Sequence, residues 1–136
     1  MKKIVILGGG ESGTGSAVLA RKQGFDTFLS DSGTIKPAYR EILEKNNISF
    51  EEGKHSEEII FSADEVIKSP GIPEKNPLIK SLHEKGIPVI SEIEFAGRFT
   101  DAPKICITGS NGKTTTTTLI WHMLKKAGIN AALTGN

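Results

Sequence analysis

Cysteine and long apolar runs are both scarce in this sequence of 136 residues. The one cysteine, Cys106, has no partner for a disulfide within the chain, which fits a reducing compartment. Its place in the apolar run KICIT predicts a buried strand position. No apolar run approaches the ~20 residues of a membrane span, and the initial run, residues 4–7, is too short for a signal peptide. We therefore expect a cytoplasmic protein.

An excess of charge of one sign is also lacking. The formal net charge is +1, with 37% hydrophobic and 24% charged residues, an ordinary balance for a globular protein. No global field draws such a chain to nucleic acid or to a membrane. His55, His83 and His122 stand singly, without the spacing of metal ligands.

Short β-branched runs alternate with helical patterns through the first hundred residues. This alternation predicts an α/β fold with a Rossmann-like parallel sheet covered by helices on both faces. We expect strands at 3–7, 26–31, 48–53, 65–71 and 87–91, and helices at 16–24, 36–47, 56–61, 76–86 and 92–99.

The segment TDAP, residues 100–103, interrupts this alternation and marks a domain boundary near 98–103. The run KICIT (104–108) then predicts a strand that leads through a glycine loop into a helix, and AALTG (131–135) predicts a further strand. We expect a first domain over residues 1–98 and the start of a second over 99–136. Two strands and one helix rarely fold alone, so the exposed strand edges are expected to pair between molecules.

The first glycine loop, Gly8, Gly10 and Gly13, has the pattern G-x-G-x-x-G between a strand and a helix. Glycines there let a phosphate approach the N–H groups at the helix start, where the helix dipole favours anions. Asp31, at the end of the second strand, lies where a carboxylate accepts hydrogen bonds from a ribose or a base. The same glycines also suit a tight turn with close packing and no ligand, and the motif alone does not choose among nucleotides.

The second glycine loop, TGSNGKTT, departs from the common P-loop because Ile107 stands where the first glycine would be. Its N–H groups can still wrap a phosphate, Lys113 can reach phosphate oxygens, and Thr114 can hold Mg²⁺ directly or through a water. Five threonines open the helix that follows. We assign a functional role to Thr114 and Thr115, and packing or backbone hydrogen bonding to residues 116–118.

Together the two loops resemble those of the Mur ligases and their folylpolyglutamate synthase relatives, which are ATP-dependent amide-bond-forming enzymes. The resemblance is strongest to the branch that adds D-glutamate, and the L-alanine-adding branch is the nearest alternative. It rests on ITGSNGKTT, ILGGGESG, Asp31, KSPGIP at 68–73, NPLI, GIPVISEIEF and GN at 135–136.

The resemblance implies a reaction in peptidoglycan synthesis. The γ-phosphate of ATP, with Mg²⁺, passes to the carboxylate of UDP-N-acetylmuramoyl-L-alanine, and the amine of D-glutamate displaces phosphate from the resulting acyl phosphate. The family also implies some three hundred further residues, so we expect the 136 residues alone to be an inactive amino-terminal part of a monomeric enzyme.

The resemblance also implies two sets of site residues. ATP phosphates would meet Gly109, Ser110, Asn111, Gly112, Lys113, Thr114 and Thr115, with Lys113 catalytic and Thr114 at the metal. The uridine substrate would meet Gly10, Ser12, Gly13, Asp31, Ser32, Ser69, Pro70, Gly71 and Asn136. One departure affects the uracil side: Gly33 stands where relatives often carry a basic or hydrogen-bonding residue, and Lys36 is the nearest basic residue.

Two other functions remain open from the residues alone. The first loop with Asp31 also suits a non-catalytic module that binds NAD. The second loop also suits a phosphate-binding scaffold without ligase chemistry.

Overall fold

The computed structural model describes residues 1–134, which form two compact units, Met1–Asp101 and a second that begins at Ala102. The division falls inside the region 98–103 where the sequence predicts a boundary.

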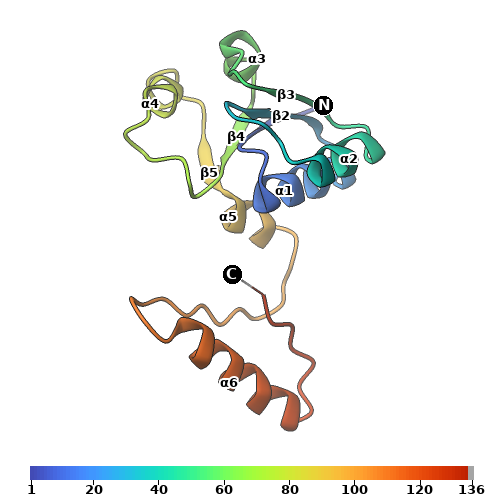
Figure 1. Cartoon of the computed structure of the whole chain (residues 1–136), viewed down its shortest axis with the longest axis vertical. Coiled ribbons are helices and arrows are strands. Elements are labelled where there is room, and N and C mark those ends of the chain that lie inside the picture. The colour runs from blue at the N-terminus through green and yellow to red at the C-terminus, as the bar shows by residue number, and fades with distance from the viewer. Residues whose placement is uncertain (135–136) are drawn as a thin grey trace. The chain divides into compact units, whose positions relative to one another are not determined.

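The first unit is built on a parallel sheet, as the alternation of strands and helices predicts (Figure 1). The strand order is β3-β2-β1-β4-β5, so the chain starts at the centre, moves to one edge, and returns to the other side of β1. The strands are β1 (Lys3–Leu7), β2 (Asp26–Asp31), β3 (Ser49–Glu52), β4 (Glu65–Lys68) and β5 (Val89–Ser91).

Helices cover both faces of this sheet (Figure 1). Side chains alternate along β1, so Ile4 and Ile6 enter one core cluster while Val5 and Leu7 enter the other. The first cluster includes side chains of α1, α2 and α5, and the second includes those of α3 and α4. The helices are α1 (Glu11–Lys22), α2 (Pro37–Lys45), α3 (Glu57–Phe61), α4 (Pro77–Glu84) and α5 (Glu92–Gly97).

Local sequence signals account for several helix ends. Proline opens α2 and α4, where its fixed φ suits the first turn. Gly24 and Gly86 follow α1 and α4 with φ values of 81° and 71°, a conformation that glycine adopts without a Cβ clash. The start of α1 differs from the prediction, because the helix begins at Glu11 inside the glycine loop rather than at residue 16.

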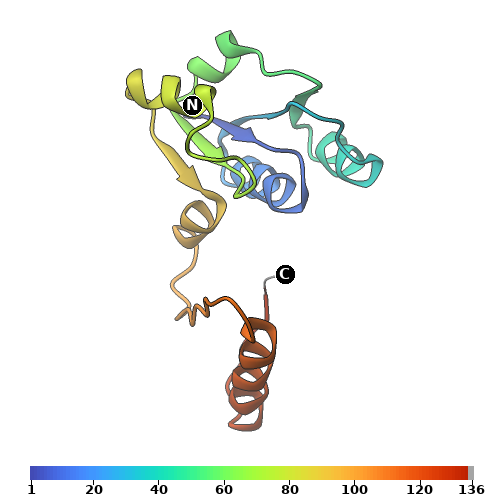
Figure 2. The ribbon, with the colours of Figure 1, turned by 60° about the vertical axis from the view of Figure 1, so that its left-hand side comes forward.

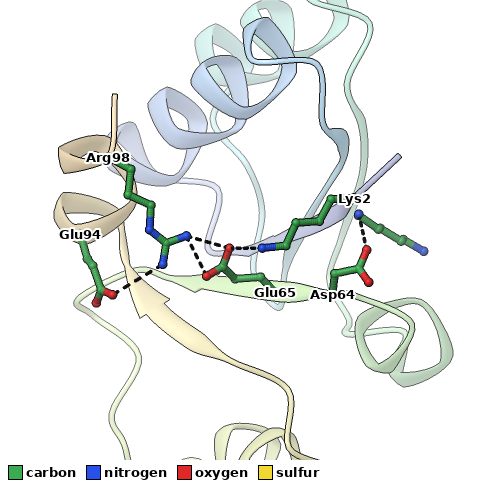
Figure 3. A network of polar contacts seen from close by, with 6 residues as sticks. Lys2, Asp64, Glu65, Glu94 and Arg98 are labelled. Atoms are coloured by element: carbon green, nitrogen blue, oxygen red, sulfur yellow. Dashed lines mark hydrogen bonds and ion pairs between the residues drawn. The ribbon is translucent and has the colours of Figure 1, made fainter. Parts of the chain in front are cut away.

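A buried carboxylate ties the sheet to α5 at the start of β4 (Figure 3). Glu65 is 4% exposed, and Nη1 of Arg98 donates to both of its carboxylate oxygens at 2.9 Å. Nζ of Lys2 donates to the same carboxylate at 3.0 Å. Two cations thus compensate one desolvated charge, which fixes the end of α5 against the sheet.

Replacing Arg98 with methionine is expected to lower the free energy of unfolding by about 2 kcal/mol, because Glu65 stays buried with Lys2 alone. Urea denaturation followed by circular dichroism measures the change. Glu94→Gln is the matched control, since it removes only the exposed contact at 3.7 Å from Arg98 and should cost less than about 0.5 kcal/mol. Equal losses in the two variants would contradict the role given to Glu65.

The second unit contains the helix α6 (Lys113–Lys126) (Figure 2). The predicted strand at 104–108 is not formed, and neither is the predicted strand at 131–135 within its described residues, 131–134. A strand is stabilised by hydrogen bonds to a neighbour, and this unit forms no strand among the residues that the structure describes. The edges expected to pair between molecules are therefore absent there, and Cys106 is exposed rather than buried.

The threonine run behaves as expected in its later positions. Oγ1 of Thr117 donates to the Lys113 carbonyl at 2.6 Å, and Oγ1 of Thr118 donates to the Thr114 carbonyl at 2.8 Å. Such bonds satisfy the hydroxyls within the helix. Trp121 is half-buried, and its Nε1 donates to the Ala131 carbonyl at 3.0 Å. None of the helices described over residues 1–134 combines the length and the apolar character that crossing a bilayer requires.

Candidate functional site

The carboxyl ends of β1, β2 and β4 meet at one edge of the sheet, because all the strands are parallel. The order in which strands are added changes side at β1: β2 and β3 lie on one side of it, and β4 and β5 on the other. Ligands of open α/β sheets bind outside the strand ends at such a point. The first glycine loop follows β1, Asp31 ends β2, and the turn from Ser69 follows β4. The fold therefore brings together the residues predicted for the uridine substrate, apart from Asn136.

Two glycines of the first loop are required by packing. Gly8 has φ 104°, and its N–H donates to the Ser30 carbonyl at 2.9 Å. A Cβ on Gly13 would lie 1.9 Å from the carbonyl oxygen of Gly8. The first turn of α1 therefore approaches the end of β1 more closely than any other residue allows.

Gly10 has no such reason to be glycine. A Cβ there would meet nothing within 4 Å, and its backbone is extended, with φ −77° and ψ −169°. Gly10 is the N-cap of α1 and supplies no side-chain hydrogen bond to the first turn, where Ser, Asp or Asn commonly does. The first turn of α1 therefore has no side-chain cap, and glycine at its N-cap leaves room for a phosphate beside it.

Both carboxylate oxygens of Asp31 accept hydrogen bonds from backbone N–H groups. Its Oδ2 accepts from the Gly9 N–H at 2.5 Å, and its Oδ1 accepts from the Gly33 N–H at 2.7 Å. The carboxylate thereby ties the glycine loop to the segment after β2, a role that the sequence reading missed. Its remaining lone pairs are still available to a ligand. Ser32 and Gly33 are exposed beside it, and Lys36 is the exposed N-cap of α2.

A tight turn follows β4. The Ser69 N–H donates to the Leu7 carbonyl, and the Ile72 N–H donates to the Ser69 carbonyl, both at 3.0 Å, with Pro70 and Gly71 exposed between them. Oγ of Ser69 lies so close to the glycine loop that a Cβ on Gly8 would come within 2.6 Å of it. The turn and the first glycine loop therefore lie next to each other at the candidate site.

Ser12 is held by a residue that the sequence reading placed only at a helix start. Oγ of Ser12 donates to Oε1 of Glu92 at 2.6 Å, and Glu92 is 8% exposed in the first turn of α5. The acidic first turn suits the helix dipole, as expected. Because the Ser12 proton points to Glu92, the hydroxyl offers a ligand its lone pairs rather than its proton.

A second group of hydrogen bonds, which the sequence did not predict, connects the segment after β3 to the end of β2. Glu51 accepts from the N–H of Ser56 at 2.7 Å and from its Oγ at 2.5 Å, and Oγ of Ser30 donates to Glu51 at 2.8 Å. Burial raises the pKa of Glu51, but these hydrogen bonds and Lys54 outweigh it and hold the pKa below the ordinary value of 4.5. Glu51 therefore stays ionised at neutral pH. Nδ1 of His55 lies 2.6 Å from Oγ of Ser30, the hydroxyl that also donates to Glu51.

The second glycine loop leads directly into α6. Gly112 is the N-cap and has φ 76°, a left-handed conformation. Nζ of Lys113 donates to the Gly109 carbonyl at 2.6 Å, so the side chain folds back along the loop. Ser110, Asn111, Thr114 and Thr115 are exposed around it. The residues predicted for ATP are thus contiguous, with a cation and a helix N-terminus on one loop.

The predicted roles of Asn136 and Thr114 are not tested by the described residues. Asn136, predicted to reach the substrate, lies outside the described residues. Within residues 1–134, no group of three or more His, Cys, Asp or Glu side chains is placed to hold a metal ion. Thr114 as a ligand of Mg²⁺ therefore stays a prediction.

Comparison with known proteins identifies relatives of this arrangement. Residues 2–91 match the family model described as "Mur ligase MurD-like, N-terminal domain". A protein of Bacteroides fragilis named UDP-N-acetylmuramoylalanine–D-glutamate ligase is 64% identical over the whole chain, and one of the same name from Chlorobaculum tepidum is 42% identical over 96% of it. The chain spans 31% and 29% of the length of these curated relatives.

Solved structures show the same fold. A murein peptide ligase from Psychrobacter arcticus matches 94% of this chain and 27% of its own, with a TM-score of 0.68 and 27% identity. The UDP-N-acetylmuramate–alanine ligase of Thermotoga maritima matches 94% of this chain and 30% of its own, with a TM-score of 0.63 and 26% identity.

Proposed function

The chain belongs to the MurD-like family of Mur ligases, and we propose that residues 1–98 bind the UDP part of UDP-N-acetylmuramoyl-L-alanine. Gly10 is the observation that carries the proposal. It leaves open space at the start of α1, where neither packing nor backbone conformation calls for glycine. The pyrophosphate would occupy this space, against the N–H groups of Ser12 and Gly13.

The uridine would lie between the ends of β2 and β4. Asp31 and Ser32 would contact it from one side, and the turn Ser69–Gly71 from the other. Because Asp31 already accepts two backbone hydrogen bonds, we propose that it orients the loop as well as contacting the ligand. Asn136 would reach the sugar.

The second loop would hold ATP. Its residues fit a chain of phosphates: Gly112 turns the backbone, the first turn of α6 presents N–H groups, and Lys113 supplies a positive charge. Mg²⁺ at Thr114 would neutralise phosphate charge when bound. Lys113 would stabilise the charge that develops as the γ-phosphate moves to the substrate carboxylate.

The whole protein is then a ligase that joins D-glutamate to UDP-N-acetylmuramoyl-L-alanine through an acyl phosphate. The relatives that are 42% to 64% identical carry the D-glutamate name, which favours this amino acid over L-alanine. The 136 residues span 31% of such a relative, and we propose that they do not turn over substrate alone. Formation of the amide by these residues, detected by mass spectrometry, would overturn that part.

Ligand-dependent thermal stability tests the proposal. UDP and UDP-N-acetylmuramoyl-L-alanine should each raise the Tm, because a ligand at 100 times its Kd adds about 2.7 kcal/mol to the folded state. Gly10→Ala should lower the Tm of the free protein only slightly, because alanine is a poorer N-cap than glycine, and should lose this rise, because its Cβ would enter the space proposed for the pyrophosphate.

Two outcomes would contradict it. A rise with NAD but not with UDP would assign the first loop to a dinucleotide. An unchanged rise in Gly10→Ala would place the uridine ligand elsewhere.

A further inference from the structure

Lys68 is the last residue of β4 and directly precedes the turn Ser69–Gly71, which lines one side of the proposed uridine site. Its side chain is 14% exposed and lies on the same face of the sheet as Val66, away from α1. Nζ donates to the Ile72 carbonyl at 2.8 Å and pairs with Glu74 at 3.0 Å. One cation therefore holds two points of the segment that follows β4.

The carbonyl of Ile72 is the more important of these contacts. The N–H of Ile72 closes the turn on the Ser69 carbonyl, while its side chain packs on the core cluster that includes Val5 and Leu7. Holding its carbonyl as well leaves the end of the turn little freedom. The start of the turn is fixed by the bond from Ser69 to Leu7, so both ends are anchored to the sheet.

Glu74 adds a second, outer contact. The hydrogen bond from Lys68 lowers the pKa of Glu74 below its ordinary value, so the carboxylate is ionised at neutral pH. Nε2 of His83, on α4, lies 3.8 Å from the other carboxylate oxygen. Glu74 is largely exposed, so this contact is screened by solvent and contributes less than the bond to Ile72.

We propose that Lys68 is a positioning residue for the uridine substrate: it holds the turn Ser69–Gly71 against the glycine loop without touching the ligand. This inference rests on the proposed function of the first unit. The inference depends on how close Ser69 lies to Gly8 and Gly13: a Cβ on Gly13 would lie 3.3 Å from Oγ of Ser69. A displacement of the turn would therefore change the shape of the site.

Lys68→Met tests the inference, because methionine keeps the apolar stem and removes the donor. Hydrogen exchange of the amides in residues 69–74 should become faster, and UDP affinity measured by calorimetry should fall about tenfold, since a hydrogen bond from a charged donor is lost. Lys68→Arg should restore both, because a guanidinium can also donate to the Ile72 carbonyl.

Two further variants separate positioning from charge. Glu74→Gln should change UDP affinity less than Lys68→Met, since the bond to Ile72 remains. Lys80→Met removes an exposed lysine of α4 and should leave both exchange and affinity unchanged.

The exchange rates and the UDP affinities together test the role of Lys68. Faster exchange in residues 69–74 with weaker UDP binding in Lys68→Met supports the inference. Unchanged exchange, or faster exchange with undiminished UDP affinity, overturns it while the proposed function stands. Absence of UDP binding by the unaltered chain overturns the proposed function and this role together.

Discussion

Gly13→Ala is expected to lower the free energy of unfolding of the first unit by about 3 kcal/mol or more. The new Cβ would lie 1.9 Å from the carbonyl oxygen of Gly8. That oxygen belongs to the backbone at the end of β1, so it has no rotamer by which to move aside, and α1 would have to shift from the sheet. Urea denaturation followed by circular dichroism measures the loss.

Gly15→Ala is the matched control two residues along the same helix. A Cβ there would meet nothing within 4 Å, and alanine has the higher helix propensity. This variant should be more stable than the unaltered chain by up to about 1 kcal/mol. If Gly13→Ala were as stable as Gly15→Ala, close approach could not be the reason for glycine at position 13.

The fold of the first unit follows from signals that are local in the sequence. Short β-branched runs, proline at helix starts and glycine at helix ends each act within a few residues, and they predicted every strand and helix there. The start of α1 was not predicted, because Glu11, Ser12 and Gly13 belong to a glycine-rich sequence that is typical of a loop. Their helical conformation depends on Gly13 packing against Gly8, a contact between two elements.

The second unit shows where local signals fail. The apolar, β-branched run at 104–108 has strand propensity, but propensity stabilises a strand only beside a neighbour. The start of α6 was predictable, because Gly112 and Lys113 act on the backbone that they occupy. The burial expected for Cys106 depended on the missing strand and was wrong with it.

The candidate site divides in the same way. Its backbone features could be predicted from spacing alone: one glycine loop lies between β1 and α1, and the other leads into α6. Its supporting side chains could not, because Glu92 reaches Ser12 across 80 residues and Glu51 meets Ser30 across 21. Nothing near Lys68 in the sequence distinguishes it from an exposed lysine, and only the path of the turn after β4 places a carbonyl within its reach.

Lys113→Ala is expected to separate the two ligand sites. In a ligase of the relatives' full length that carries these residues, amide formation should fall about 10²–10³-fold, because the developing charge on the transferred phosphoryl group loses its cation. The affinity for UDP-N-acetylmuramoyl-L-alanine should stay nearly unchanged, since the residues assigned to it, apart from Asn136, belong to the first unit. Steady-state turnover and calorimetry measure the two effects.

Lys126→Ala is the control for this variant, because it removes a lysine from the last turn of the same helix, α6. It should leave turnover within about twofold, as expected of a surface charge far from the loop in sequence. The contrast between positions 113 and 126 isolates the contribution of a cation at the glycine loop from that of charge on the helix. An equal loss of turnover and of uridine-substrate affinity in Lys113→Ala would refute the assignment of phosphoryl transfer and uridine binding to separate loops.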